Sequence, residues 1–394
     1  MVNYRLATEE QRELALGARE IMERELVPHL EEYEHADEGR GQYPWKVHRA
    51  LAEAGYYAMN VPEDWGGLDL DIKTRTIILE EMAKIDAGFS FAFYNGGSYF
   101  PLILQTGMST EEKQGWAERM MAGDEFGCFI ITEPDAGSDA AAMRTTAVKD
   151  GNDWVLNGVK CFASNGPDAT FFLVAAWTDK TKKASEGVTF FLVERDRGVQ
   201  VSKKENKMGL KLSGTAELVF DNVRVPEDHV IGEVGKGFGA SLGVIRTEGR
   251  PIGAVVNLGI AQAALDYAVD YAKTRRQFGK RVIDHDGLGF LIADMKARTD
   301  ACRALIYHFV DCQAAGLPTD DLSPVVKMYV SDCTMQTTID AVQVLGGYGY
   351  MKDYPVEKYM RDAKIFQIFS GTNQIQRRTI ARLIAGRDPM KAKK

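Results

Sequence analysis

The spacing of apolar and polar positions divides the chain into three stretches with different periodicities. From the start to about residue 124, apolar residues such as Leu14 and Ala18 recur at intervals typical of amphipathic helices. Thr8 stands three residues before Gln11, a pair that resembles a capping box at a helix start. This pattern predicts a helical region over residues 1–124.

Further helices are expected in this region over 44–54, 74–85 and 86–105, the last interrupted at Gly96 and Gly97. Phe89, Phe93 and Phe100 lie near one face of that last helix. Packing in a hydrophobic core is the ordinary role of such aromatic side chains. The functional alternative is that they form the wall of an apolar ligand pocket.

Short runs rich in β-branched and aromatic residues follow from about residue 126. They are Gly127–Ile131, Trp154–Leu156, Phe171–Ala175, Val188–Val193 and Ala216–Phe220. Turn signals at 150–153 and at Asn157-Gly158 separate some of these runs, which favours hairpin connections. We therefore expect a middle antiparallel β domain over residues 125–235.

Long helical patterns return from Gly237 to the end of the chain. They cover 238–274, 288–315 and 321–345, and a last stretch begins at Arg361. The basic end, 390–394, is expected to be a solvated tail. The pattern predicts a helical domain over 236–394, and the order α, β, α predicts an α+β multidomain fold.

Composition narrows the class of protein without naming a function. A chain of 394 residues is long enough for two or three packed domains. Its net charge of −8 argues against nucleic-acid binding, which needs a basic face. The five cysteines show no metal or redox spacing, which is typical of reduced thiols. No signal segment or spanning apolar run is evident, so we expect no membrane and a cytoplasmic protein; a mature mitochondrial matrix protein has the same features.

Several motifs follow one another along the chain, and each resembles a motif of the acyl-CoA dehydrogenases. They are Thr132–Ser138, Asn157–Lys160, Met208–Ser213, Asn222–Pro226, Arg275–Gly279, Gln343–Gly347 and Phe366–Gln376. One motif alone is weak evidence, but the set occurs in family order and spacing over nearly the whole chain. The resemblance implies an N-terminal helical domain, a middle β domain and a C-terminal four-helix bundle. It also implies FAD at a dimer interface within a homotetramer.

The resemblance assigns cofactor contacts residue by residue. Phe129, Ile131, Thr132, Phe162 and Ser164 would line the flavin ring, with Thr132 on its N5/O4 side and Gly137 and Ser138 in the same polar turn. Arg275, Gln277 and Phe278 would reach a neighbouring subunit's flavin, and Gln343, Gly346 and Gly347 would contact adenosine diphosphate. Phe369, Thr372 and Gln374 would also face the cofactor. A flavin needs such donors at its ring edge, an apolar wall and cations at its pyrophosphate.

Substrate contacts and partners are implied in the same way. The substrate is an acyl-CoA thioester, with Ser138 and Arg250 near the CoA phosphates. Phe93 and Phe238 would lie along the acyl site, and a backbone N–H near Gly371 would hold the thioester carbonyl. The electron acceptor implied is an electron-transfer flavoprotein, and no metal is expected.

One position departs from the family at the centre of the chemistry. Most members carry a glutamate where this chain has Ser370, and that carboxylate removes the α-proton. A serine hydroxyl is far too weak a base at neutral pH. Some members carry the base on the long helix directly before the arginine that corresponds to Arg250, where this chain has Gly249. The carboxylate is at Glu248 instead, and a shift of one residue rotates a helical side chain by roughly 100°.

Several interpretations remain open from the sequence. Glu248 is a candidate base for ordinary dehydrogenation, although a solvated helix glutamate is its plainer role. Deprotonation elsewhere on an alicyclic acyl group, such as cyclohexene carboxyl-CoA, would be served by the helix around Tyr94 and Asn95. Elimination without proton abstraction, as in desulfinase-like members, would call for an arginine near the acyl end, and 89–100 has none. A catalytically silent subunit that binds FAD or CoA is the alternative from another class.

Overall fold

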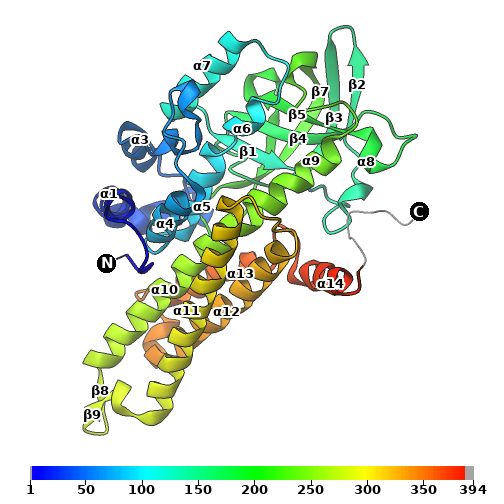
Figure 1. Cartoon of the computed structure of the whole chain (residues 1–394). Helices are drawn as coiled ribbons and strands as arrows, with labels where there is room; N and C mark the ends of the chain where they lie inside the picture. Colours follow the sequence, from blue (N-terminus) through cyan, green and yellow to red (C-terminus); the bar gives the residue numbers. More distant parts are fainter. Residues whose placement is uncertain (1, 387–394) are drawn as a thin grey trace.

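The computed structural model describes residues 2–386 and shows the three parts in the predicted order (Figure 1). The N-terminal helices are α1 (Glu9–Glu25), α2 (Leu30–Gly39), α3 (Trp45–Glu53), α4 (Ile72–Ala83), α5 (Ala87–Gly97), α6 (Phe100–Ile103) and α7 (Thr110–Met121). The capping box of α1 is confirmed, because the Thr8 side chain accepts from Gln11 N and the Gln11 side chain accepts from Thr8 N. The basic end at 390–394 lies outside the described residues.

The predicted helix over 86–105 is divided in two, and the glycines explain where. A Cβ at Gly96 would lie 2.0 Å from the Phe126 ring, and one at Gly97 would lie 2.7 Å from the Tyr57 ring. Both aromatic rings therefore press directly against the backbone of α5 at its end. The chain then turns before Pro101 in the first turn of α6, where proline is well tolerated.

The middle part is one twisted sheet beside the N-terminal helices, at the upper right of Figure 1. Its strands are β1 (Gly127–Ile130), β2 (Thr146–Asp150), β3 (Asp153–Ser164), β4 (Phe171–Trp177), β5 (Val188–Glu194), β6 (Gln200–Lys204) and β7 (Thr215–Pro226), and a short helix, α8 (Ala184–Gly187), precedes β5. The strand order is β1-β4-β2-β3-β7-β6, with β5 also paired to β4. The expectation of an antiparallel sheet holds for most pairings, but β1 and β2 run parallel to β4.

Two strands and one turn differ from the prediction. β2 and β6 are mostly exposed, so their sequences carry few apolar residues and give little strand signal. Asn157-Gly158 is not a turn but lies inside β3, where the pairing with β7 shifts register. Gly158 has φ 156° and its Cβ would lie 2.3 Å from Thr145 Oγ1, so it serves a bulge.

The C-terminal part is a bundle built on a very long helix. That helix consists of α9 (Gly237–Val244), a π-helical turn (Ile245–Gly249) and α10 (Arg250–Thr274). A small hairpin, β8 (Arg276–Gln277) and β9 (Lys280–Arg281), leads to α11 (Asp286–Ala314), α12 (Leu322–Leu345), α13 (Val356–Lys364) and α14 (Asn373–Ile384). α12 packs against α10, α11, α13 and α14.

The core joins the first and last parts of the chain. One hydrophobic cluster contains buried residues of α1, α4 and α5 together with residues of α10, α11 and α12. α4 packs on α10, and α9 packs on β5. The long helix therefore passes from the sheet to the far end of the bundle, beside the N-terminal helices (Figure 1). The expected boundaries at 124/125 and 235/236 fall in the connections α7–β1 and β7–α9.

The segment 237–274 is long and apolar enough to cross a membrane by composition alone. However, 83% of its most apolar window is buried inside the protein. Its apolar character is accounted for by packing against α4, α11 and α12.

Candidate active site

A π-helical turn over Ile245–Gly249 interrupts the long helix where the three parts of the chain meet. Pro251 follows it and has no N–H to donate to the carbonyl of Thr247, four residues back. Side chains from the bundle use the freed carbonyls instead. Gln313 Nε2 donates to Thr247 O at 3.3 Å, and Ser323 Oγ donates to Arg246 O at 2.9 Å. The wider turn is therefore stabilised from outside the helix, and π turns of this kind are frequent at functional sites.

The π turn directs Glu248 into the protein. Its carboxylate is half-buried and accepts a hydrogen bond from the hydroxyl of Tyr94 at 3.3 Å. Burial raises the pKa of Glu248, while the nearby charge of Arg75 and the Tyr94 hydrogen bond oppose that rise. Glu248 is therefore half-buried and hydrogen-bonded to Tyr94, rather than fully solvated on the helix surface. A π turn contains one residue more than an α-helical turn, so it rotates the side-chain directions by about 100° relative to a regular helix. A regular helix would point Glu248 in a different direction.

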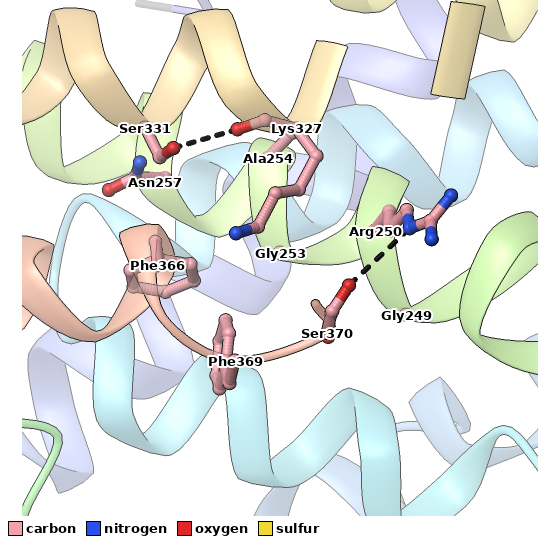
Figure 2. A pocket seen from close by; sticks show the side chains of 10 residues that line it. All are labelled: Gly249, Arg250, Gly253, Ala254, Asn257, Lys327, Ser331, Phe366, Phe369 and Ser370. Carbon is pink, nitrogen blue, oxygen red and sulfur yellow. Dashed lines mark hydrogen bonds between the residues drawn. The ribbon is translucent and has the colours of Figure 1, made fainter. Parts of the chain in front are cut away.

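The loop around Ser370 faces the beginning of α10, as Figure 2 shows. Ser370 and Gly371 have φ values of 53° and 87°, so both lie in the left-handed region. Gln376 Nε2 donates to the carbonyls of Ser370 at 3.2 Å and Gly371 at 2.8 Å. Arg250 Nε donates to Ser370 O at 3.4 Å, and Lys327 Nζ donates to Gly371 O at 2.8 Å. These donors hold a backbone shape that serine does not favour by itself.

Two positions without a carboxylate lie next to each other in this site. A Cβ at Gly249 would lie 3.6 Å from Ser370 Oγ. The resemblance places a base at one or the other of these positions, and the structure brings both to one place. Glu248 is the carboxylate immediately before Gly249, and its side chain enters the protein from the same turn.

The helix that carries Tyr94 and Asn95 lies beside Glu248. Tyr94 is 1% exposed, and Asn95 Oδ1 accepts a hydrogen bond from Tyr99 at 3.3 Å. Phe93 points into the core instead, where its ring lies 4.6 Å from that of Tyr57 and 6.2 Å from that of Phe89. Tyr94 and Asn95 are thus placed beside the site, and Phe93 has the packing role.

A buried ion pair shapes the segment after β1. Lys160 Nζ donates to Glu133 Oε1 at 2.8 Å and to Ile131 O at 3.0 Å, and Glu133 also accepts from the backbone of Thr145 at 3.1 Å. Burial alone would raise the pKa of Glu133, but Lys160 and its N–H donors hold it below its ordinary value. Cys161 N donates to Thr132 O at 3.0 Å, so the carbonyl of Thr132 is fixed as well. The half-buried side chain of Thr132 is therefore held by a backbone that Lys160 and Cys161 fix in place.

The other residues expected along the flavin ring differ in how far they are exposed. A β-bulge between Lys160 and Ala163 turns the ring of Phe162 outward, and 64% of this residue is exposed. Phe129 is half-buried with its ring 6.4 Å from that of Tyr99, and Phe238 at the start of α9 packs against the same hydrophobic cluster. Ile131 is buried, Ser164 is half-buried at the end of β3, and Gly137 and Ser138 lie in an exposed turn.

A hollow at the far end of the bundle gathers the residues expected at adenosine diphosphate. It is lined by Arg275, Gln277, Gln343, Gly346 and Gly347, among others. A Cβ at Gly346 or Gly347 would meet no described atom within 4 Å, and Gly346 has φ 62°, so the backbone is open to a ligand. Phe278 follows the lining residue Gln277 in the sequence and is 95% exposed. A guanidinium, side-chain amides and bare backbone fit the phosphates and adenosine of FAD.

Residues on either side of Gly371 have structural contacts as well as the expected contacts with the cofactor. The Thr372 side chain caps α14 by accepting from Ile375 N at 3.3 Å, and Gln374 is exposed. Phe369 stacks on Phe91 with ring centres 4.9 Å apart. The sequence interpretation missed Lys327, whose burial lowers its pKa to about 7 and which faces the loop in Figure 2.

The sequence interpretation also missed Arg75 and the effect of Pro251. Arg75 lies on α4, and its Nη1 is 3.5 Å from the hydroxyl of Tyr94. Nothing in the polar pattern of α4 points to this contact, because it joins residues that are far apart in the chain. Pro251 inside a predicted helix was a visible signal for an irregular turn.

Comparisons with known proteins agree with this architecture. The N-terminal, middle and C-terminal domain models of the acyl-CoA dehydrogenases match residues 8–124, 128–223 and 235–385. An acyl-CoA dehydrogenase of Bacillus subtilis is 38% identical over 382 residues, which cover 96% of this chain and 99% of that protein. Cyclohexane-1-carbonyl-CoA dehydrogenase of Syntrophus aciditrophicus is 39% identical over 86% of this chain and 88% of that protein. Butyryl-CoA dehydrogenase from Megasphaera elsdenii superposes with a TM-score of 0.90 at 36% identity, covering 96% of this chain and 99% of that one.

Fold and site together define a flavin-dependent oxidoreductase built from two helical parts around a sheet. The chain belongs to the acyl-CoA dehydrogenase family, and its cofactor is FAD. The predicted family, fold and cofactor are therefore confirmed.

Proposed function

We propose that this enzyme dehydrogenates an acyl-CoA thioester between its α and β carbons, with Glu248 as the base. One observation carries the proposal: the π turn directs the half-buried Glu248 toward Tyr94, and Gly249, the next residue, lies against Ser370. Burial raises the pKa of Glu248. FAD, when bound, supplies the acceptor for the β-hydrogen and its electron pair. The residues of this chain supply the removal of the α-proton and the orientation of the thioester.

Glu248 suits proton abstraction because of its surroundings. A carboxylate with a raised pKa is a stronger base than one in water, and it is better matched to a weakly acidic C–H group. Tyr94 donates to Oε2 at 3.3 Å and thereby orients the carboxylate. The base has to be ionised to act, so the reaction is expected to fail as the pH falls below the pKa of Glu248.

The Ser370 loop is proposed to bind the thioester rather than to take its proton. Gly371 is half-buried, and the loop shape is fixed by Gln376, Arg250 and Lys327. A rigid backbone N–H at this place can donate to the thioester carbonyl, which makes the α-proton more acidic. The roles proposed for Ser138 and Phe238 toward CoA and the acyl group follow from the family resemblance.

An alicyclic or otherwise bulky acyl group is the substrate class that we favour. The Syntrophus relative is a cyclohexane-1-carbonyl-CoA dehydrogenase. Gly249 and Ser370 are both smaller than the glutamates of other members, which leaves more room beside the α-carbon. Abstraction from a distant ring carbon would need an ionisable carboxylate on this helix, and Asn95 is a neutral amide that accepts from the Tyr99 hydroxyl.

Elimination of a leaving group is the second candidate function. The arginine that such a reaction calls for is missing from 89–100, but α4 brings Arg75 within 3.5 Å of the Tyr94 hydroxyl. This candidate needs no proton abstraction. It therefore predicts that replacement of Glu248 leaves the rate unchanged.

The partners proposed for the enzyme are an electron-transfer flavoprotein and three further copies of the chain. We propose a cytoplasmic location, and the bacterial origin of the Bacillus subtilis relative supports it. The hollow at the far end of the bundle lies a full helix length from Arg250 and the Ser370 loop, which supports assembly.

Anaerobic reduction of the flavin by a panel of straight, branched and cyclic acyl-CoAs tests the function. Wild-type enzyme is expected to lose its flavin absorbance with at least one thioester. Glu248→Gln is expected to slow this reduction by roughly 100- to 10,000-fold, the usual contribution of a general base. Ser370→Ala is the matched control and should retain the rate. Full rate in Glu248→Gln would remove Glu248 as the base.

A further inference from the structure

Arg75 is a half-buried cation with an incomplete set of partners. Its Nη1 donates to Asn60 Oδ1 at 2.5 Å and lies 3.5 Å from the hydroxyl of Tyr94. Its Nε is buried and has no acceptor among the described residues. Buried guanidinium groups are normally satisfied by a carboxylate or by several carbonyls, so this arrangement calls for an explanation.

No carboxylate of the described chain lies within ion-pair distance of Arg75. By contrast, Arg303, buried between α4 and the bundle, pairs directly with Glu80 at 2.8 Å. Asp71 is near Arg75, but its carboxylate accepts from Lys73 N at 2.8 Å and Thr74 N at 3.1 Å as the cap of α4. Asp69 is also near Arg75, but it is exposed to solvent. Glu248 is the acid on the interior side on which the charge of Arg75 acts.

Tyr94 connects the two charged groups. Its hydroxyl donates its one proton to Glu248 Oε2 at 3.3 Å, while its oxygen lies 3.5 Å from Arg75 Nη1. A hydroxyl between a guanidinium and a carboxylate is polarised in one direction, because the cation attracts the oxygen and the carboxylate attracts the proton. Asn60 is 6% exposed and holds the guanidinium from the other side.

We propose that Arg75 is a positioning residue that, through Tyr94, keeps Glu248 ionised and oriented in the closed site. This inference rests on the proposed role of Glu248 as the base. A bound acyl group excludes water from Glu248, so the positive charge of Arg75 replaces the stabilisation that water would give. Arg75 touches neither substrate nor cofactor in this role.

The other ionisable groups around Glu248 do not supply this charge. On its own helix, Arg246 pairs with Asp320 at 2.8 Å, and Arg250 donates to Ser370 O. Tyr99, which follows α5, has its pKa raised well above the ordinary value by burial and stays neutral. Arg75 on α4 and Tyr94 on α5 are the groups that oppose the effect of burial on the pKa of Glu248.

The sign of the expected pH effect follows from this arrangement. Loss of Arg75 leaves burial less opposed, so the pKa of Glu248 rises further. The acidic limb of the rate profile then moves to higher pH, and the rate recovers when the pH is raised. A change that merely disturbed packing would lower the rate at every pH instead.

The experiment measures the rate of anaerobic flavin reduction against pH for Arg75→Met, Arg75→Lys and Tyr94→Phe. Arg75→Met is expected to move the acidic limb up by roughly one pH unit or more, which is about a tenfold loss on that limb. Arg75→Lys keeps the charge and should stay near wild type, and Tyr94→Phe should show a smaller shift. Arg246→Met is the matched control, because it removes the same charge from a position that faces away, and it should show no shift.

Three results would overturn the inference. An unshifted Arg75→Met profile means that Arg75 does not act on the base, and a loss equal at all pH values means that it acts only through packing. A loss confined to thioesters with a polar acyl group means that Arg75 binds substrate. If Arg75→Met binds no FAD because it does not fold, Tyr94→Phe decides by the same criterion. Failure of the proposed function is recognised by a different result: Glu248→Gln would then keep its full rate of flavin reduction.

Discussion

At the scale of single residues, the proposed base, Glu248, lies one position before the position that carries the base on the long helix of some family members. Gly249 and Ser370 carry no carboxylate, yet a Cβ at one would touch the hydroxyl of the other. Glu248 is half-buried, has a raised pKa and accepts a hydrogen bond from Tyr94, which suits the proposed role as base. The substitution at Ser370 is therefore not a sign of general decay, because the loop that carries it keeps its full set of backbone hydrogen bonds.

A glutamate introduced at position 370 is expected to take over the proposed role of Glu248 as the base. The backbone there already lies in the left-handed region, so glutamate adds little strain beyond that of serine. Glu248→Gln/Ser370→Glu should recover on the order of tenfold or more of the flavin-reduction rate lost in Glu248→Gln. No recovery with any thioester of the panel would mean that the substrate lies differently from the pose proposed here.

The buried pair of Lys160 and Glu133 is expected to be essential for the sheet. Lys160→Met would leave Glu133 buried without its cation, which costs about 3–5 kcal/mol in the free energy of unfolding. Chemical denaturation followed by circular dichroism measures this loss. The matched control is Lys149→Met, because Lys149 forms an exposed pair with Glu227 and should cost at most about 1 kcal/mol.

At the scale of elements, regular patterns were predictable and irregular ones were not. The long helices α11 and α12 and the capping box at Thr8 follow from local spacing, so they appear within a few residues of their predicted bounds. The exposed strands β2 and β6 lack an apolar face, and their pairing depends on neighbours that are distant in the chain. The contact of Arg75 with Tyr94 depends on how α4 and α5 pack, which no local pattern contains.

Pro251 is expected to maintain the π turn. Pro251→Ala restores an N–H that can donate to Thr247 O, which favours a regular helix and rotates Glu248 away by roughly 100°. The flavin-reduction rate should fall on the order of 100-fold, whereas the melting temperature should stay the same or rise. Pro28→Ala, an exposed position in a 3-10 turn, is the control for the exchange itself. A fully active Pro251→Ala enzyme would show that the proline does not set the position of the base.

At the scale of the whole molecule, two sets of expected ligand-binding residues lie at opposite ends of α10. Arg250 and the Ser370 loop are at its beginning, and Arg275 with the hollow around Gly346 is at its end. A helix of 25 residues is roughly 37 Å long. One FAD does not bridge that length within one chain, so we expect the hollow to serve the FAD of another subunit. This separation favours the proposed assembly, in which the hollow of one subunit reaches the cofactor of another.

Phe278 is expected to join cofactor binding to assembly. It is 95% exposed with φ 50°, an unusual state for a large apolar side chain unless another molecule covers it. Phe278→Ser should lower both the FAD content of the purified protein and the fraction of oligomer. Flavin absorbance and light scattering after gel filtration measure the two effects. Leu317→Ser, at another exposed apolar position, should change neither.

The π turn has a consequence for how this enzyme can change over time. Five residues absorb the whole shift in helical phase, and α10 beyond them still packs on α12 and α4. Gain or loss of one residue in that turn would move the base without repacking the bundle. The position of the proposed base and the packing of the bundle therefore depend on nearly separate parts of the sequence, so we expect that one can change while the other stays intact.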